Sequence, residues 1–329
     1  MVGLSNTFIK TRSTPFAQGQ VIKSGGQKIE TSFLLKREEA FLNHRFVAAG
    51  IGTDQVIISD DGVNWYSHTV PGIFNHPTIC NDEGGNFYIS NYGSSDLTIL
   101  YPNCGSELAF LPYSSNWFSI CHADGKFLMS DNSMTNKALF SVNGRNWSEM
   151  TLPITALWRS IIYAEGKFIF ASQTGNKILM SSDLANWASS DISQGLWHCI
   201  CYWNGKYILI DLGDITNGST LASYSDDCIA WHDITLPIAA PWHYACHGDG
   251  KFVMISYGTD NVLISYDGIN WIGYKLPVPA TYACVRYGNG KFVAVGENSV
   301  VYSSDAINWF SANVPIQGKW YGLGYGEWS

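Results

Sequence analysis

A repeat of about 40 residues runs through most of this chain and constrains the fold more than any other feature. Its first mark is a turn followed by an aromatic residue, and this mark recurs at Phe46, Phe87, Phe127, Phe168, Tyr207, Phe252 and Phe292. Its second mark is a serine that precedes a tryptophan by six residues; the pairs are Ser59 and Trp65, Ser141 and Trp147, Ser181 and Trp187, Ser225 and Trp231, Ser265 and Trp271, and Ser303 and Trp309. The two marks share one period, which indicates seven copies of a single structural unit.

Each copy has the pattern of four short strands. Apolar and polar residues alternate, as in 291–295, and no copy holds a ten-residue stretch with helical periodicity. The clearest copy predicts strands over 282–287, 291–295 and 299–303, and a fourth that starts near Trp309. Units of this kind and period form the blades of β-propellers. We therefore expect an all-β fold, a seven-bladed β-propeller of four-stranded antiparallel blades.

The two ends of the repeat region predict how the ring closes. The first recognisable strand, 44–49, is the second strand of a unit and has no first strand before it. Residues 320–327 follow the seventh unit and have the pattern of a first strand. We expect this C-terminal strand to complete the first blade, because that pairing removes the open sheet edges.

Residues 1–40 precede the repeats and form a predicted N-terminal docking arm, with the propeller over 41–329. The arm carries a net charge of +3, whereas the whole chain carries −8. A hairpin is expected over 20–31 and a short helix over 33–42. The open alternative is that this arm packs against the side or floor of the propeller.

Composition excludes several classes of function. A net charge of −8 disfavours nucleic acids and anionic membranes as partners. Neither a signal peptide nor a run of 18 apolar residues is present, so we expect a soluble protein with no membrane insertion. Six of the cysteines occupy equivalent places in different units, namely Cys80, Cys121, Cys201 and Cys246 in one place and Cys199 and Cys284 in another. This recurrence predicts unpaired packing residues.

The Ser-x-Asp-Gly-x-Asn-Trp turn at 265–271 and the Gly-x-Gly-Lys-Phe motif at 288–292 resemble the Asp-box, or bacterial neuraminidase, repeat. The likeness is greatest to the version found in propellers of bacteriophage tail and virion proteins, and it covers residues 44–327. It implies a propeller fold. A virion location, with the arm contacting other virion proteins, follows from this resemblance alone.

A sialidase-like glycoside hydrolase is one alternative that the resemblance implies, and it would need a triad of arginines. Arg12 and Arg37 precede the repeats, and Arg145 lies in a turn. Arg159 and Arg286 occupy first-strand places of opposite parity, which predicts opposite faces of their blades. We therefore expect no arginine triad and no catalytic residues.

Histidines raise the question of a metal site. His198 and His243 share the second place of neighbouring first strands, whereas His122 and His247 share the sixth. A metal or a proton relay is geometrically possible, but no carboxylate or cysteine recurs beside them at ligand spacing. We expect neither a metal nor a cofactor.

Two sets of residues are candidates for binding. Most first strands begin with an aromatic residue; these are Trp117, Trp158, Trp197, Trp242, Tyr282 and Trp320, with His76 at the equivalent place. They would either line an aromatic mouth for sugars or act as wedges between blades, and recurrence in every blade favours wedges. The second set lies in loops that vary from unit to unit, a common place for binding residues, and comprises Tyr92, Asn132, Asp211, Asp214 and Asn217.

These observations lead to one expectation of function and two alternatives. We expect a non-enzymatic binding and assembly module of a phage virion, anchored by its arm. Its variable loops would bind a host-surface glycan or a protein partner. The alternatives are the sialidase-like hydrolase and a purely structural virion subunit.

Overall fold

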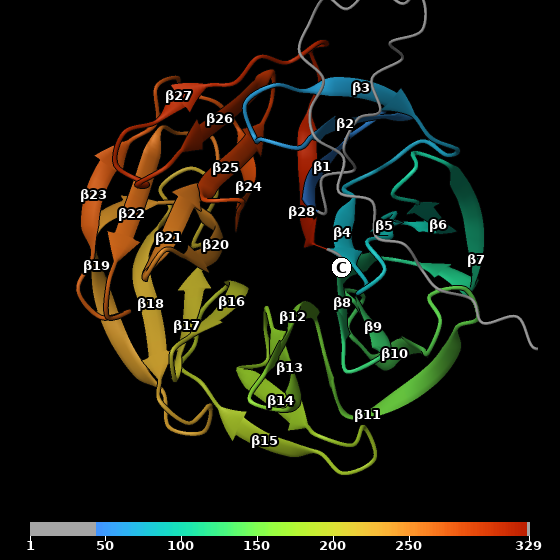
Figure 1. The fold of residues 1–329 in the computed structure, drawn as a ribbon. Coiled ribbons are helices and arrows are strands. Elements are labelled where there is room, and N and C mark those ends of the chain that lie inside the picture. Colours follow the sequence, from blue (N-terminus) through green and yellow to red (C-terminus); the bar gives the residue numbers. More distant parts are fainter. Residues whose placement is uncertain (1–43, 328–329) are drawn as a thin grey trace, which may run out of the picture. The chain divides into compact units, whose positions relative to one another are not determined.

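The computed structural model of the protein describes residues 44–327. Their 28 strands form seven four-stranded antiparallel sheets, arranged as blades around a central axis (Figure 1). The predicted all-β, seven-bladed propeller is confirmed. The predicted hairpin and helix of the N-terminal arm lie outside the described residues, and the division at residue 40 remains a prediction.

Strands occupy four positions from the axis outward. The inner strands are β4 (Thr78–Asn81), β8 (Trp117–Ala123), β12 (Trp158–Ala164), β16 (Trp197–Trp203), β20 (Trp242–Gly248), β24 (Tyr282–Gly288) and β28 (Trp320–Glu327). The second strands are β1 (His44–Gly50), β5 (Phe87–Ser90), β9 (Lys126–Asp131), β13 (Lys167–Ser172), β17 (Lys206–Asp211), β21 (Lys251–Ser256) and β25 (Lys291–Gly296). We number the blades 1 to 7 in the order of these second strands.

The two remaining strands of each blade lie farther out. The third strands are β2 (Gln55–Ser59), β6 (Ser94–Leu100), β10 (Thr135–Ser141), β14 (Lys177–Ser181), β18 (Ser219–Ser225), β22 (Asn261–Ser265) and β26 (Ser299–Ser303). The outer strands are β3 (Tyr66–Thr69), β7 (Ser106–Ser115), β11 (Ser148–Ala156), β15 (Ala188–Asp191), β19 (His232–Ala240), β23 (Ile272–Lys275) and β27 (Phe310–Ser311). Blade 7 therefore matches the strand positions expected from the clearest repeat.

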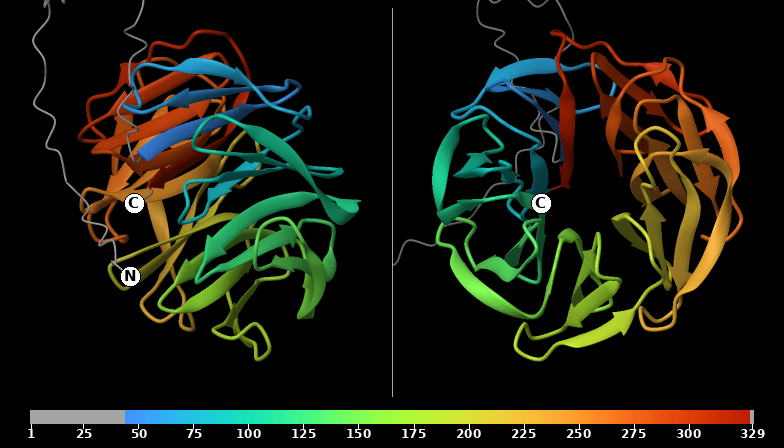
Figure 2. Two further views of the ribbon diagram at one scale, coloured as in Figure 1. Left: turned by 45° about the vertical axis from the view of Figure 1, so that its right-hand side comes forward. Right: turned by 180° about the vertical axis from the view of Figure 1, so that it is seen from behind.

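The C-terminal strand closes the ring as predicted. β28 pairs with β1 in antiparallel register, with Phe46 opposite Tyr325 and Ala48 opposite Leu323. The two strands lie side by side although they come from opposite ends of the described chain (Figure 2). Gly324 lets β28 pack against the next blade, since a Cβ there would come within 2.6 Å of the Ile79 side chain on β4.

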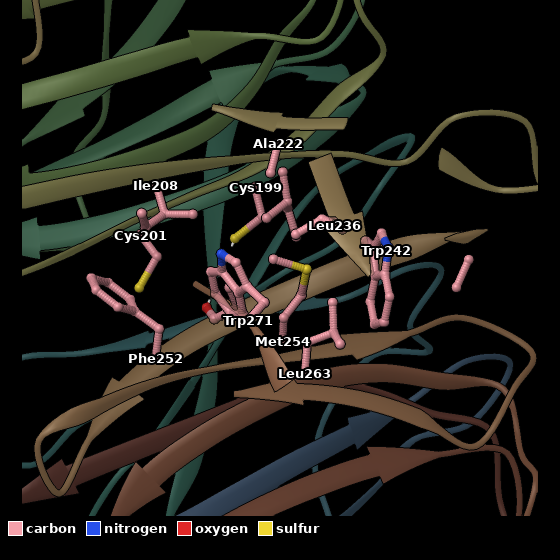
Figure 3. Close-up of a cluster of buried hydrophobic side chains, with 13 residues drawn as sticks. Cys199, Cys201, Ile208, Ala222, Leu236, Trp242, Phe252, Met254, Leu263 and Trp271 are labelled. Carbon is pink, nitrogen blue, oxygen red and sulfur yellow. Dashed lines mark hydrogen bonds between the residues drawn. The ribbon is translucent and has the colours of Figure 1, made fainter. Parts of the chain in front are cut away.

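Each pair of neighbouring blades shares its own hydrophobic core. The core between blades 5 and 6 joins Cys199, Cys201 and Ile208 from one blade to Phe252 and Met254 from the other (Figure 3). Six further cores of the same kind lie between the other neighbouring blades. Burial is thus spread around the ring, which makes each blade depend on its neighbours for a hydrophobic core.

The repeated turn between the third and outer strands is built as the sequence predicts. In blade 6, Ser265 Oγ accepts the Gly268 amide at 2.8 Å, and Asp267 Oδ1 accepts the Ile269 and Asn270 amides at 2.8 Å. Gly268 has a φ of +74°, where glycine is favoured. This turn fixes the path of the chain without reaching the axis.

The connections leave the ring on two faces. The turn face carries the short turns between inner and second strands and the Ser-to-Trp turns. The loop face carries the loops between second and third strands and those that lead to the next blade. Inner strands start at the loop face, so their first residues surround the axis there.

Candidate functional site

A β-bulge recurs near the start of the inner strands. In β8, β12, β16, β20, β24 and β28 the register with the second strand slips by one residue directly after the first residue of the strand. The extra residues are Phe118, Arg159, His198, His243, Ala283 and Tyr321, and together they line one cavity on the axis, of about 40 Å³. We call this set the bulge ring. A bulge re-aims a side chain, so the repeated slip places one variable side chain per blade at the axis.

The bulges bring together two arginines that the sequence analysis separated. Parity along a regular strand would place Arg159 and Arg286 on opposite blade faces. The extra residue in β12 and in β24 breaks this parity, and both arginines line the same cavity. The expectation of opposite faces is therefore wrong. The other described arginines, Arg45 and Arg145, bind Asp60 and Glu107, so the described residues form no arginine triad.

Arg159 is a largely buried cation whose partners are all neutral. Its guanidinium lies 3.3 Å from the centre of the Phe118 ring and donates a hydrogen bond to His198. Its Nε is buried without a hydrogen-bond partner, and among residues 44–327 no carboxylate pairs with it. Burial lowers the pKa of Arg159 to about 10, so the group still carries a positive charge at neutral pH.

Arg286 lines the cavity of the bulge ring and also a second cavity on the axis. Its Nη2 donates to the Tyr244 hydroxyl at 2.5 Å, and its guanidinium lies 4.6 Å from the centre of that ring. Burial acts to lower the pKa of Arg286, but Tyr244, Cys284 and Cys199 together outweigh it, and the pKa is raised. The group stays charged, again with no ion-pair partner within the described part of the chain.

Cysteines surround Arg286. All eight cysteines are free thiols, which confirms the prediction of unpaired residues. Burial raises the pKa of Cys80, Cys121, Cys201 and Cys246, and the charge of Arg286 opposes that shift for each of them. These thiols stay protonated at neutral pH and give Arg286 a weakly polar environment with no countercharge.

The two buried histidines of the ring are held neutral. His198 Nδ1 donates to the backbone oxygen of His243 at 2.6 Å, and His243 Nδ1 donates to that of Ala283 at 2.7 Å. Burial and the nearby charge of Arg159 depress both pKa values, that of His243 to about 3. Because a carbonyl can only accept, the proton sits on Nδ1, and Nε2 of His243 keeps its lone pair. Tyr321 approaches that atom at 3.4 Å.

Two larger cavities flank the bulge ring. One, of about 330 Å³, is lined by His76, Tyr257, Glu297 and Tyr321 at the loop face. The other, of about 570 Å³, extends from Arg286 to the turn face. No group of three or more histidine, cysteine or acidic side chains suited to a metal ion occurs within residues 44–327.

The predicted loop residues lie at the same end of the ring but have different surroundings. Tyr92 lies 6.4 Å from Phe118 and joins the surroundings of the bulge ring. Asp211 and Asp214 instead accept backbone amides of their own blade, and Asn217 completes the turn at Asp214. Asn132 has a buried Oδ1 with no partner among the described residues. A binding role for these five residues remains a prediction.

The residues of the predicted aromatic mouth are almost fully buried. Its six residues are at most 1% exposed and pack between blades; they are Trp117, Trp158, Trp197, Trp242, Tyr282 and Trp320. This burial favours the wedge interpretation, and a role in sugar binding remains a prediction without support from exposure. The residue directly after each of them changes chemistry from unit to unit, whereas the aromatic residue before it repeats.

Comparison with known proteins identifies the fold. No family model matches the chain, and no curated protein matches its sequence. Among solved structures, virginiamycin B lyase from Staphylococcus aureus superimposes with a TM-score of 0.65 at 14% identity, over 74% of this chain and 85% of that one. A streptogramin B lyase gives 0.67 at 13%, over 87% and 93%. AztD from Citrobacter koseri gives 0.63 at 9%, over 86% and 97%. At these identities the likeness shows the propeller fold.

These neighbours correct one expectation. The expectation that this protein is not an enzyme is wrong as a plain statement, because two of the similar structures are lyases of the same fold. The propeller fold is confirmed, and a binding or assembly role remains a prediction. None of the reported neighbours is an Asp-box or phage protein. Residues 44–327 contain no helix that is long and apolar enough to span a membrane.

Proposed function

We propose that this protein binds a small anionic ligand on the axis of the propeller, at the bulge ring. The observation that carries the proposal is the pair Arg159 and Arg286, which line one cavity and have no carboxylate partner among the described residues. Two charged guanidinium groups removed from bulk water have a large desolvation cost unless an anion accompanies them. A carboxylate or phosphate would supply the missing countercharge.

Other donors at the cavity suit an oxyanion. Arg159 Nε is a buried donor with no partner, and a ligand oxygen would satisfy it. Ser119 Oγ accepts the Ile161 amide at 3.1 Å, and Ser160 Oγ accepts the Ile200 amide at 3.3 Å. Each serine hydroxyl therefore keeps its own proton to donate. Arginine donors in such a setting form short, charge-assisted bonds to oxyanions.

Isothermal titration calorimetry with acetate and inorganic phosphate tests this proposal. Replacing Arg159 or Arg286 by glutamine should weaken binding by at least about tenfold, the effect of losing a charged hydrogen bond. Arg145→Gln is the matched control, since Arg145 is exposed and pairs with Glu107 away from the axis. Equal affinity in the wild type and in Arg159→Gln would refute the proposal, as would no binding of either anion.

A lyase reaction on the bound acid is a second candidate, and neutral His243 favours it. Its Nε2 lone pair is a base beside Arg159, and a bound anion that offsets the Arg159 charge would raise the pKa of His243 toward a useful range. The test is incubation with quinupristin, the compound named with a similar inactive lyase, followed by chromatography and mass spectrometry. Substrate should disappear with the wild type and persist with His243→Ala. Equal persistence with both proteins would remove this candidate.

A role in a phage virion is the third candidate function. It rests on the resemblance of the repeats and on the position of Tyr92 and the 211–219 loop at the same face as the anion cavity. An acidic sugar at the end of a host glycan is a ligand that would use both features. A glycan array should show binding of acidic glycans that is lost in Arg159→Gln. Binding of neutral glycans alone would argue against this role.

A further inference from the structure

The turn-face cavity is a second compartment on the axis, with its own chemistry. It has a volume of about 570 Å³, within the roughly 300–1,000 Å³ range of ligand pockets. Its lining reaches from Arg286 and Tyr244 in the middle of the ring to Asp249 in the turn after β20. Because Arg286 also lines the cavity of the bulge ring, the two compartments meet at this guanidinium.

Aromatic side chains from consecutive blades form one wall of this cavity. They come from the ends of β12, β16, β20 and β24 and are Tyr163, Tyr202, Trp203, His247 and Tyr287. We call this set the aromatic arc. Burial first, and then the charge of Arg286, lower the pKa of His247. The aromatic arc and Arg286 therefore line the same cavity.

Specific contacts hold the rings of the arc in place. Tyr202 donates to Glu165 at 2.7 Å and accepts the Gly205 amide at 3.1 Å. Gly248 leaves room for the next blade, since a Cβ there would come within 2.1 Å of Tyr287 Cγ. Trp203 lies edge-on to a core phenylalanine with ring centres 5.7 Å apart. Fixed rings of this kind bind flat ligands with little loss of side-chain freedom.

We propose that the aromatic arc binds the aromatic ring of an aryl acid whose carboxylate reaches Arg286. Sugar rings fit the lining less well, because sugar hydroxyls need several strong acceptors. The only carboxylate on this lining is Asp249, which already pairs with Lys251 at 2.5 Å. This inference rests on the proposed anion site for its acidic half and goes beyond it by naming the aryl group.

Calorimetry with four probes separates recognition of the carboxylate from recognition of the aryl ring. The probes are acetate, phenylacetate, the neutral phenylacetamide and glucuronate. Phenylacetate should bind at least about tenfold more tightly than acetate. Tyr163→Ala should reduce phenylacetate affinity by about threefold to tenfold and leave acetate affinity unchanged. Tyr163 is 37% exposed, so this variant is expected to fold. Tyr266→Ala, at a 57% exposed tyrosine in a Ser-to-Trp turn, is the matched control and should change neither affinity.

The outcomes distinguish this inference from the proposed function. Equal affinity for acetate and phenylacetate, or tighter binding of glucuronate than of phenylacetate, would overturn the aryl assignment while the anion site stands. Phenylacetamide binding that depends on Tyr163 but not on Arg286, with no acetate binding, would overturn the anion site and also the acidic half of this inference. Weaker phenylacetate binding in both Tyr163→Ala and Arg286→Gln, but not in Tyr266→Ala, is the supporting result.

Discussion

The Ser-to-Trp turns and the bulge ring both recur around the propeller. The turns conserve their side chains from blade to blade, whereas the bulge ring conserves only its backbone geometry. The turns repeat their side chains, so that Ser265 and Asp267 have close counterparts in other blades with the same hydrogen bonds. The bulge ring repeats its backbone slip but varies the side chain, from arginine to histidine to alanine. A repeated side chain indicates a folding device, whereas a repeated backbone device with varied side chains indicates a site.

Both the turns and the bulge ring belong to a closed ring of blades. Removing residues 319–329 tests this closure and should have the largest effect on stability. Without β28 the strand β1 loses its inner pairing partner, and β4 and β24 lose the strand between them. We expect the truncated chain to lose cooperative unfolding at 25 °C, as measured by circular dichroism and calorimetry. A thermal transition at the wild-type temperature would contradict the closure.

Trp158 and Arg159 are adjacent in sequence but have different roles. Trp158 packs between blades, whereas Arg159 belongs to the proposed anion site. Trp158 is fully buried between blades, so Trp158→Ala should cost about 3–5 kcal/mol in urea denaturation. Arg159→Gln should cost less than about 1 kcal/mol or should stabilise the protein, because it removes a desolvated charge. The contrast would fail if Arg159→Gln destabilised the fold as much as Trp158→Ala does.

Acid should destabilise the histidines of the bulge ring and the Ser-to-Trp turns in different pH ranges. The folded pKa values of His198 and His243 lie below the unfolded value of about 6.5, so their neutral forms are favoured in the fold. Stability is then constant above pH 6.5 and is lost as the pH falls toward the folded values. Each buried histidine should contribute a loss of about 2 kcal/mol between pH 6.5 and pH 5. His243→Gln should flatten the measured stability profile in this window.

The turns should respond only at lower pH. Burial opposes the charged form of Asp267, but the Asn270 and Ile269 hydrogen bonds outweigh it and lower the pKa. Stability from this carboxylate is present above the unfolded pKa of about 3.9 and is lost as the pH falls below it. A stability profile of His243→Gln that still declined from pH 6.5 with the wild-type slope would contradict the separate windows.

The smallest expected effects concern single turns. Asp267→Ala removes acceptors for two backbone amides and should cost about 1–2 kcal/mol by urea denaturation. Ala306 takes the place of Gly268 in blade 7 with a φ of +64°, and Ala306→Gly should relieve up to about 1 kcal/mol. Gly268→Ala is the reverse test and should destabilise, since its Cβ would come within 2.5 Å of Ile208. A stabilising Gly268→Ala would contradict this account of the turn.

Sequence periodicity was enough to predict the seven blades, the four strands of each blade and the closing strand. It was also enough to place the variable loops on one face. It failed at Arg159 and Arg286, because counting alternate positions assumes a regular strand and six inner strands carry an extra residue. It also offered the aromatic starts of the inner strands as a possible mouth, whereas packing against the next blade buries them.

By itself the amino-acid sequence determined the number of blades, their turns and the way the ring closes. These properties depend on the residues of local turns and on the alternation of apolar and polar residues. Both patterns can be recognised within the sequence of one repeat. The tertiary structure decided which side chains meet on the axis. That outcome depends on a bulge in each of six inner strands and on contacts between residues about 40 positions apart, such as His198 with His243. No local pattern encodes such contacts, because each needs two separate blades to pack against one another.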